Sequence, residues 1–318
     1  MIETLFRKET AMIRLSKAQF ENATTYIMKQ GRPLEQAICR YNFNGAPKED
    51  ILIELKKFQN VDGGFGNALE PDLRASESSA LCTLFALDIL VDLEVSSDEL
   101  MIEKSINYLM RTYDKKDHIW RLIPETTDTS PHAPWWNQDG LDNRFGNFLA
   151  NPRVHICGHL FHYQELTPQD FRNDLLKRVL AQMETLKGKV SGDKLICYLR
   201  LANCNNLPFN EKKRIHRKIR EIIPASVETD SGKWDEYCLK PYWVIESPHS
   251  AFLDIIDQAL NDNLDYEICN QDKDGSWKPF WSWEKTYPEY WSVAKQEWSA
   301  ILTLNLIKIL QKFGRIEN

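Results

Sequence analysis

The chain has 318 residues, of which 42% are hydrophobic, 27% charged and 11% aromatic. This composition is typical of a globular protein with a large core, and it excludes a disordered or collagen-like chain. Lysine and arginine number 40 against 46 aspartates and glutamates, so the net charge is −6. Because nucleic-acid-binding proteins neutralise phosphates with basic side chains, we expect no nucleic-acid partner.

The sequence predicts a cytoplasmic protein without a membrane span. No segment approaches the roughly 20 consecutive apolar residues that cross a bilayer. The first ten residues, MIETLFRKET, include acids where a signal peptide has basic and apolar regions. The seven cysteines lack C-x-x-C spacing, as is typical of free thiols in a reducing compartment.

A helical hairpin is predicted after one or two extra helices in residues 1–45. Residues 47–58 (PKEDILIELKKF) show the spacing of an amphipathic helix with a proline near its start. The run Q-x-x-D-G-G-F-G at 59–66 predicts a tight turn, because glycine readily adopts positive φ. Residues 79–90 are apolar on nearly every side and predict a buried helix.

The same features return near the C-terminus. Residues 271–277 share the pattern Q-x-x-D-G-x-aromatic with residues 59–65. Residues 299–310 then match residues 79–90 at six of twelve positions. Weaker copies lie between them, and their spacing fits about five or six hairpins.

These hairpins predict one all-α domain over residues 1–318. A single hairpin cannot bury its own apolar face, so neighbouring hairpins must pack together. We therefore predict an α/α toroid, or barrel, with apolar helices inside and amphipathic helices outside. Residues 1–45 would add the extra N-terminal helices.

The two turn motifs with their following apolar helices resemble the repeat of terpenoid cyclases of the squalene-hopene type and of protein prenyltransferase β subunits. The resemblance implies an α/α toroid with a central aromatic-lined cavity that holds an apolar ligand such as an isoprenoid. The D-x-D-D and D-D-x-x-D motifs of the cyclases are absent, so no reaction is assigned.

Candidate ligand-binding residues lie in the loops between each turn and the next apolar helix, which lead to the mouth of the predicted cavity. The first such loop carries Glu70, Asp72 and Arg74, and the last carries Trp281 and Trp283. Acids at helix starts also serve as caps and dipole partners. The candidates for proton transfer or other catalytic roles are His155, Asp235 and Glu297.

Metal binding has two candidate sets, and the sequence identifies no cofactor. His155, His159 and His162 fall on one face of a helix predicted over 153–164, and the first two could share a zinc ion with a third ligand from elsewhere. Histidines of a protein core would explain this spacing equally. The prenyltransferase resemblance implies a second zinc set. Its members would be Asp235, Cys238 and His249, although their spacing departs from the family pattern.

The irregular stretch 120–150 supports a different function. It contains Trp135, Trp136, Asp139 and Asp142, and tryptophans beside acids are typical of carbohydrate-active enzymes. Such an enzyme would use two acids from a set that comprises Asp139, Asp142, Asp235, Glu246, Glu284 and Glu297. Alternatively, the aromatic residues only plug the barrel, and the protein is a non-catalytic scaffold that binds another protein.

Overall fold

The computed structural model describes residues 12–317, and within this range the regular structure is helical, with isolated β-bridges and no strands. The all-α prediction is confirmed. The α-helices of this range are α1 (Lys17–Gln30), α2 (Pro33–Asn44), α3 (Glu49–Lys56), α4 (Ala80–Asp92), α5 (Leu100–Arg111), α6 (Leu141–Arg144), α7 (Arg153–His162), α8 (Gln169–Glu184), α9 (Gly192–Ala202), α10 (Phe209–Ser226), α11 (Leu253–Cys269) and α12 (Pro288–Lys312). Among them, none combines the length and apolar character that a bilayer crossing requires.

Short 3-10 helices occupy the longer connections. They are η1 (Glu125–Thr129), η2 (Pro134–Trp136), η3 (Gly146–Phe148), η4 (Gln164–Leu166), η5 (Ser231–Lys233) and η6 (Pro241–Trp243). The connection between α10 and α11 contains only η5 and η6 as regular structure. Residues 1–11, which include the acids that argue against a signal peptide, lie outside the described range.

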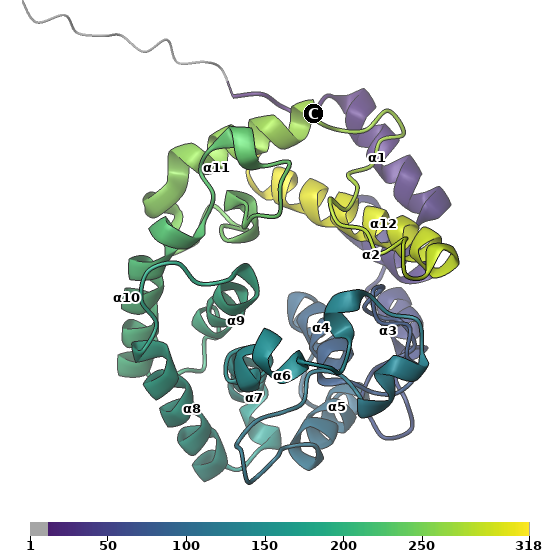
Figure 1. Ribbon diagram of the computed structural model, residues 1–318. Coiled ribbons are helices and arrows are strands. Elements are labelled where there is room, and N and C mark those ends of the chain that lie inside the picture. The colour runs from purple at the N-terminus through teal and green to yellow at the C-terminus, as the bar shows by residue number, and fades with distance from the viewer. Residues whose placement is uncertain (1–11, 318) are drawn as a thin grey trace, which may run out of the picture.

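The helices are arranged in an outer and an inner set (Figure 1). Helices α8, α10 and α11 lie along the outside, while α7 and α9 lie nearer the centre. Packing follows this order, because α7 contacts α8 and α9, and α9 contacts α10. The inner helix α4 buries side chains around much of its surface, as its apolar sequence predicts.

The outer helix α10 shows the opposite pattern. Its buried side chains form one stripe that includes Ile215, Ile219 and Ile222, and the basic side chains of the helix lie outside this stripe. A stripe of this spacing is expected for a helix with one face on the core and one in water. Apolar residues therefore mark the inner helices on most sides and the outer helices on one side.

The two turn motifs form matching hydrogen bonds. The Gln59 side chain donates from Nε2 to the carbonyl of Gly63 at 3.0 Å and to that of Met101 in α5 at 3.0 Å. The equivalent Gln271 donates to the carbonyl of Gly275 at 2.9 Å and to that of Gln19 in α1 at 3.0 Å. Each glutamine thus ties its own turn to the first turn of a neighbouring helix through carbonyl groups.

A second pair of bonds fixes the aromatic residue of each motif. The backbone amide of Phe65 donates to Oγ1 of Thr83 at 3.1 Å, and the amide of Trp277 donates to Oγ1 of Thr303 at 3.0 Å. Both threonines lie in the apolar helical segment that follows the motif. The two segments therefore share backbone and side-chain geometry as well as sequence.

The two ends of the described chain pack together. The amide of Leu15 donates to the carbonyl of Arg315 at 2.8 Å, and the amide of Glu317 donates to the carbonyl of Leu15 at 3.0 Å. Helix α1 packs along α12, and α2 contacts α1, α3 and α12. The described part of residues 1–45 thus joins the first helices to the last one.

Gly275→Ala tests the junction between the second turn and α1. Gly275 has φ +89°, and a Cβ atom there would lie 2.5 Å from the backbone of Asn22. Gly188 also has positive φ, +63°, but a Cβ atom there would meet no other atom within 4 Å, so Gly188→Ala is the matched control. We expect Gly275→Ala to lower the free energy of unfolding by about 2 kcal/mol more than the control, measured by urea denaturation. Equal losses would contradict the close approach.

Candidate functional site

A cavity of about 560 Å³ opens between α4, α7, α9 and the connection that precedes α11. Its wall is rich in charged groups and imidazoles, which are Asp88, Asp92, His155, His159, His162, Arg200, Glu246, His249 and Lys312. Aromatic side chains contribute Trp243 and Phe252. This polar wall differs from the aromatic lining that the family resemblance implies, because α4, α7 and α9 present polar side chains such as Asp88, His155 and Arg200 to the cavity.

Three of these side chains converge on one point. His155 Nε2 lies 2.8 Å from Asp88 Oδ1, and His159 Nε2 lies 3.0 Å from the same oxygen. The two imidazoles stand one turn apart on α7, with ring centroids 4.9 Å apart and planes 28° from parallel. Asp88 comes from the last turns of α4, which contacts α7. Here the Asp88–His155–His159 group is called the central triad.

Asp88 and His159 of the central triad differ in their charge at neutral pH. Burial lowers the pKa of His159 to about 4, although the Asp88 carboxylate opposes this shift. Burial alone would raise the pKa of Asp88, but attraction to His155 and Arg200 holds it well below its usual range. At neutral pH the triad therefore contains a carboxylate anion beside a neutral His159. Such a set can exchange a proton with a ligand or bind a cation.

Arg200 of α9 links the triad to the opposite wall. Its Nη1 lies 3.0 Å from Oε2 of Glu246, and its Nε lies 3.7 Å from Oδ2 of Asp88. The guanidinium thus stands between two carboxylates. Its contact with Asp88 is an ion pair without a hydrogen bond, and it involves the carboxylate oxygen to which the histidines do not bond.

A second polar cluster lies where the chain enters α4. Asp72 is 2% exposed, and its carboxylate accepts the indole N–H of Trp283 at 2.6 Å and that of Trp281 at 3.0 Å. Burial raises the pKa of Asp72 to about 6, while the indole hydrogen bonds act in the opposite direction. Two predicted ligand-binding tryptophans are therefore joined to a predicted ligand-binding acid.

The other two acids of this cluster, Glu297 and Glu70, do not contact the indoles in the way that Asp72 does. Arg74 Nη1 lies 2.5 Å from Oε2 of Glu297, so this predicted catalytic acid forms an ion pair. Burial, followed by repulsion from Asp72, raises the pKa of Glu70 well above its usual value. One carboxyl oxygen of Glu70 is buried without a hydrogen-bond partner among residues 12–317. The raised pKa favours the protonated form of Glu70 beside Asp72.

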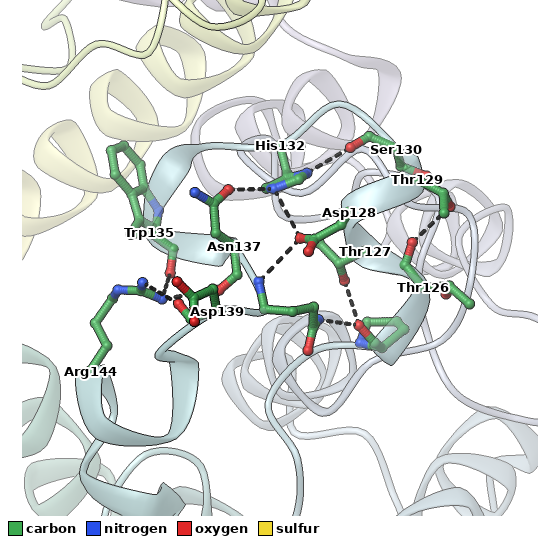
Figure 2. A network of polar contacts seen from close by, with 12 residues as sticks. Thr126, Thr127, Asp128, Thr129, Ser130, His132, Trp135, Asn137, Asp139 and Arg144 are labelled. Atoms are coloured by element: carbon green, nitrogen blue, oxygen red, sulfur yellow. Dashed lines mark hydrogen bonds and ion pairs between the residues drawn. The ribbon is translucent and has the colours of Figure 1, made fainter.

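The irregular stretch 120–150 is held together by its own polar contacts (Figure 2). His132 Nε2 lies 2.9 Å from the side-chain oxygen of Asn137, and its Nδ1 lies 2.6 Å from the carbonyl of Ser130. Arg144 donates to the carbonyls of Trp135 at 3.0 Å and of Asp139 at 2.9 Å. These bonds satisfy backbone carbonyls of a long segment whose regular structure is limited to α6 and the short helices η1, η2 and η3.

This stretch does not bring its predicted ligand-binding residues to the cavity. Trp136 is buried and stacks on Phe145, with centroids 5.2 Å apart, whereas Asp139 and Asp142 are exposed. Trp135 is half-buried. None of the four belongs to the cavity wall described above.

The zinc set that the family resemblance implies is not brought together. Asp235 is exposed and accepts a hydrogen bond from the hydroxyl of Tyr266, and Cys238 is half-buried. His249 is exposed at the cavity wall. In residues 12–317, the group of histidine, cysteine and acid side chains whose ligand atoms lie close together is the central triad. Asp235, Cys238 and His249 therefore do not fit a zinc ion, because the irregular chain between α10 and α11 separates them.

Sequence reasoning found His155 and His159 but missed Asp88 and Arg200. Both missed residues carry a charge within an otherwise apolar helix segment, LFALDILV and ICYLRLA. A buried charge requires a partner, so a charge in such a segment signals a polar site inside the protein. That signal identifies the residues but not their partners.

Comparison with protein-family models and with curated proteins finds no match for this chain. The resemblance to terpenoid cyclases and prenyltransferases thus rests on the two turn motifs and their following helices. Function has to be argued from the site itself.

The buried Asp72 gives a prediction on pH. Its pKa of about 6 in the folded protein exceeds the ordinary 3.8, so the folded state holds the proton more tightly than the unfolded chain does. Stability from this group is therefore present below pH 4 and is lost as pH rises through about 6. Between pH 4 and 7, we expect the free energy of unfolding of the wild type, relative to Asp72→Asn, to fall by about 2.4 kcal/mol. A constant difference across this pH range, measured by urea denaturation, would contradict the shift.

Proposed function

We propose that the helices form an α/α toroid, as the sequence predicts. The contact of α1 with α12 and the inner position of α7 and α9 support this architecture. The matching bonds of the two turn motifs support a common structural unit. The seven cysteines are free in the described chain, and we place the protein in a reducing compartment, the cytoplasm.

We propose further that the protein is an enzyme that acts on a small polar molecule in the central cavity. The observation that carries this proposal is the convergence of two imidazoles and a carboxylate at the wall of a cavity of about 560 Å³. Concave sites with a few convergent polar groups and shifted pKa values are typical of active sites. The central triad would be the reaction centre, with His155 in the role that the sequence predicts.

The charged wall favours a polar substrate such as a carbohydrate over a wholly apolar one. Glu246, one of the acids considered for carbohydrate chemistry, lies at this wall beside Trp243. A tryptophan face next to a carboxylate suits a sugar ring. Asp88 and Asp92 would supply further carboxylates.

A second candidate, an isoprenoid-like ligand, is favoured by a run of half-buried aromatic rings. Trp243 stacks on Phe280 with centroids 5.8 Å apart, and Trp281 lies 4.9 Å from Phe280 and 5.3 Å from Trp298. Trp243 also belongs to the cavity wall, so this run continues from the polar cavity. An apolar chain would pack along these faces.

A thermal-shift screen tests both candidates. Oligosaccharides, small carboxylates, phosphates and prenyl diphosphates would each be tested with three proteins. These are the wild type, Asn203→Trp and Asn210→Trp. Asn203 lies at the cavity wall, whereas Asn210 is exposed on α10 and serves as the control. We expect a polar compound to raise the melting temperature of the wild type and of Asn210→Trp but not of Asn203→Trp, because the indole fills the cavity.

A shift with prenyl diphosphates alone would favour the second candidate. A shift that survives Asn203→Trp would place the ligand elsewhere. Failure of every compound with the wild type would contradict ligand binding in this cavity.

A further inference from the structure

We propose that the central triad is a binding site for one divalent transition-metal ion such as zinc. The ligands would be Nε2 of His155, Nε2 of His159 and a carboxylate oxygen of Asp88. This inference deepens the proposed function, on which it rests for the view that the triad is a reaction centre. The binding of the ion itself can be tested without any substrate.

The geometry of the three atoms carries the inference. Both imidazole nitrogens point at the same oxygen, Asp88 Oδ1, at 2.8 and 3.0 Å, and all three atoms lie within 4.8 Å of one another. Zinc binds imidazole nitrogen and carboxylate oxygen at about 2.0–2.2 Å in tetrahedral geometry, which places ligand atoms about 3.3 Å apart. The two nitrogen–oxygen distances are thus within about half an ångström of the separation around a zinc ion, and small side-chain rotations would bring all three atoms to it.

The backbone holds the ligands in suitable positions. His155 and His159 project from successive turns of α7, a helix whose other side chains are nearly all buried. Side chains four residues apart on a helix lie on one face, so two histidines can bind one ion. Asp88 approaches from α4, a separate inner helix that contacts α7. The three ligands are thus fixed by two helices and not by loops.

The surroundings suit an ion that stays open to a substrate. The side chains of His155 and His159 are 12% and 6% exposed, whereas that of Asp88 is 30% exposed, so one side of the triad faces the cavity. A tetrahedral ion with three protein ligands keeps one position for water or substrate. Arg200 stands 3.7 Å from the other oxygen of Asp88 and would orient the carboxylate, as partners of metal ligands commonly do.

The chemistry of the donor set limits the choice of ion. Two imidazoles and one carboxylate suit zinc, cobalt, nickel, copper or iron, whereas magnesium and calcium prefer oxygen ligands throughout. The cysteine of the cavity wall, Cys204, does not belong to the close group of ligand atoms. The site would therefore differ from the cysteine-containing set that the family resemblance implies.

The test is a titration of the chelator-treated full-length protein with Co²⁺ and then Zn²⁺, without any organic ligand. We expect one equivalent of Co²⁺ to produce visible absorption typical of four or five ligands, and Zn²⁺ to abolish it. His155→Ala and His159→Ala should each weaken Zn²⁺ binding on the order of 100-fold, and Asp88→Asn about tenfold. His162→Ala and His249→Ala are the controls from the same cavity, and they should leave the affinity unchanged.

Circular dichroism would show whether each variant keeps its helices. X-ray absorption of the zinc-loaded wild type provides a measurement that needs no variant, and it should show two imidazole ligands. A zinc shell without imidazole, undiminished binding by the triad variants, or no uptake by the wild type would overturn the inference. If zinc binds but no compound in the thermal-shift screen raises the melting temperature, the metal site stands and the proposed function is contradicted. If a compound raises the melting temperature but zinc does not bind, the proposed function stands and the metal site is contradicted.

Discussion

The contact between α1 and α12 holds the two ends of the described chain together. Backbone hydrogen bonds join Leu15 to Arg315 and to Glu317, and the second turn motif reaches α1 through Gln271. This contact fixes α12, which carries Glu297, and the loop before it, which carries Trp281 and Trp283. Asp72 therefore meets its two indole partners, and Arg74 meets Glu297, because α12 is held beside α1.

The interior of the proposed toroid places charge at both ends of the inner helices. Asp72 lies in the loop before α4, where the indole N–H groups of Trp281 and Trp283 favour a carboxylate. Asp88 lies toward the C-terminal end of α4 and His159 in the last turn of α7, where the dipole favours positive charge, whereas His155 lies in the first turn of α7. The apolar middle of the inner helices separates these two groups. An anion at one end and a bound cation at the other would each suit the local field.

Much of the fold could be predicted from the sequence, because helices and turns leave local patterns. The amphipathic segment 47–58 became α3, the apolar segment 79–90 became α4, and the predicted helix 153–164 became α7. The spacing of His155 and His159 on one face of α7 follows from helix geometry alone.

The partners of these residues could not be predicted, because they are set by packing between distant segments. Asp88 lies 67 residues from His155 in the chain, and the indole partners of Asp72 lie 209 and 211 residues away. Asp235, Cys238 and His249 form the zinc set that the family resemblance implies, yet the irregular chain that carries them keeps them apart. Trp136 shows the same limit, since its ring stacks within its own loop.

The irregular connection between α10 and α11 supplies the part of the polar cavity wall that the helices do not. The helices α4, α7 and α9, whose other side chains are largely buried, supply the rest. Between α10 and α11 the chain runs instead through η5 and η6. A loop can satisfy its backbone while it places Trp243, Glu246 and His249 at the opposite wall from the central triad. Substrate selection would then reside in this segment, while the helices hold the reactive group in place.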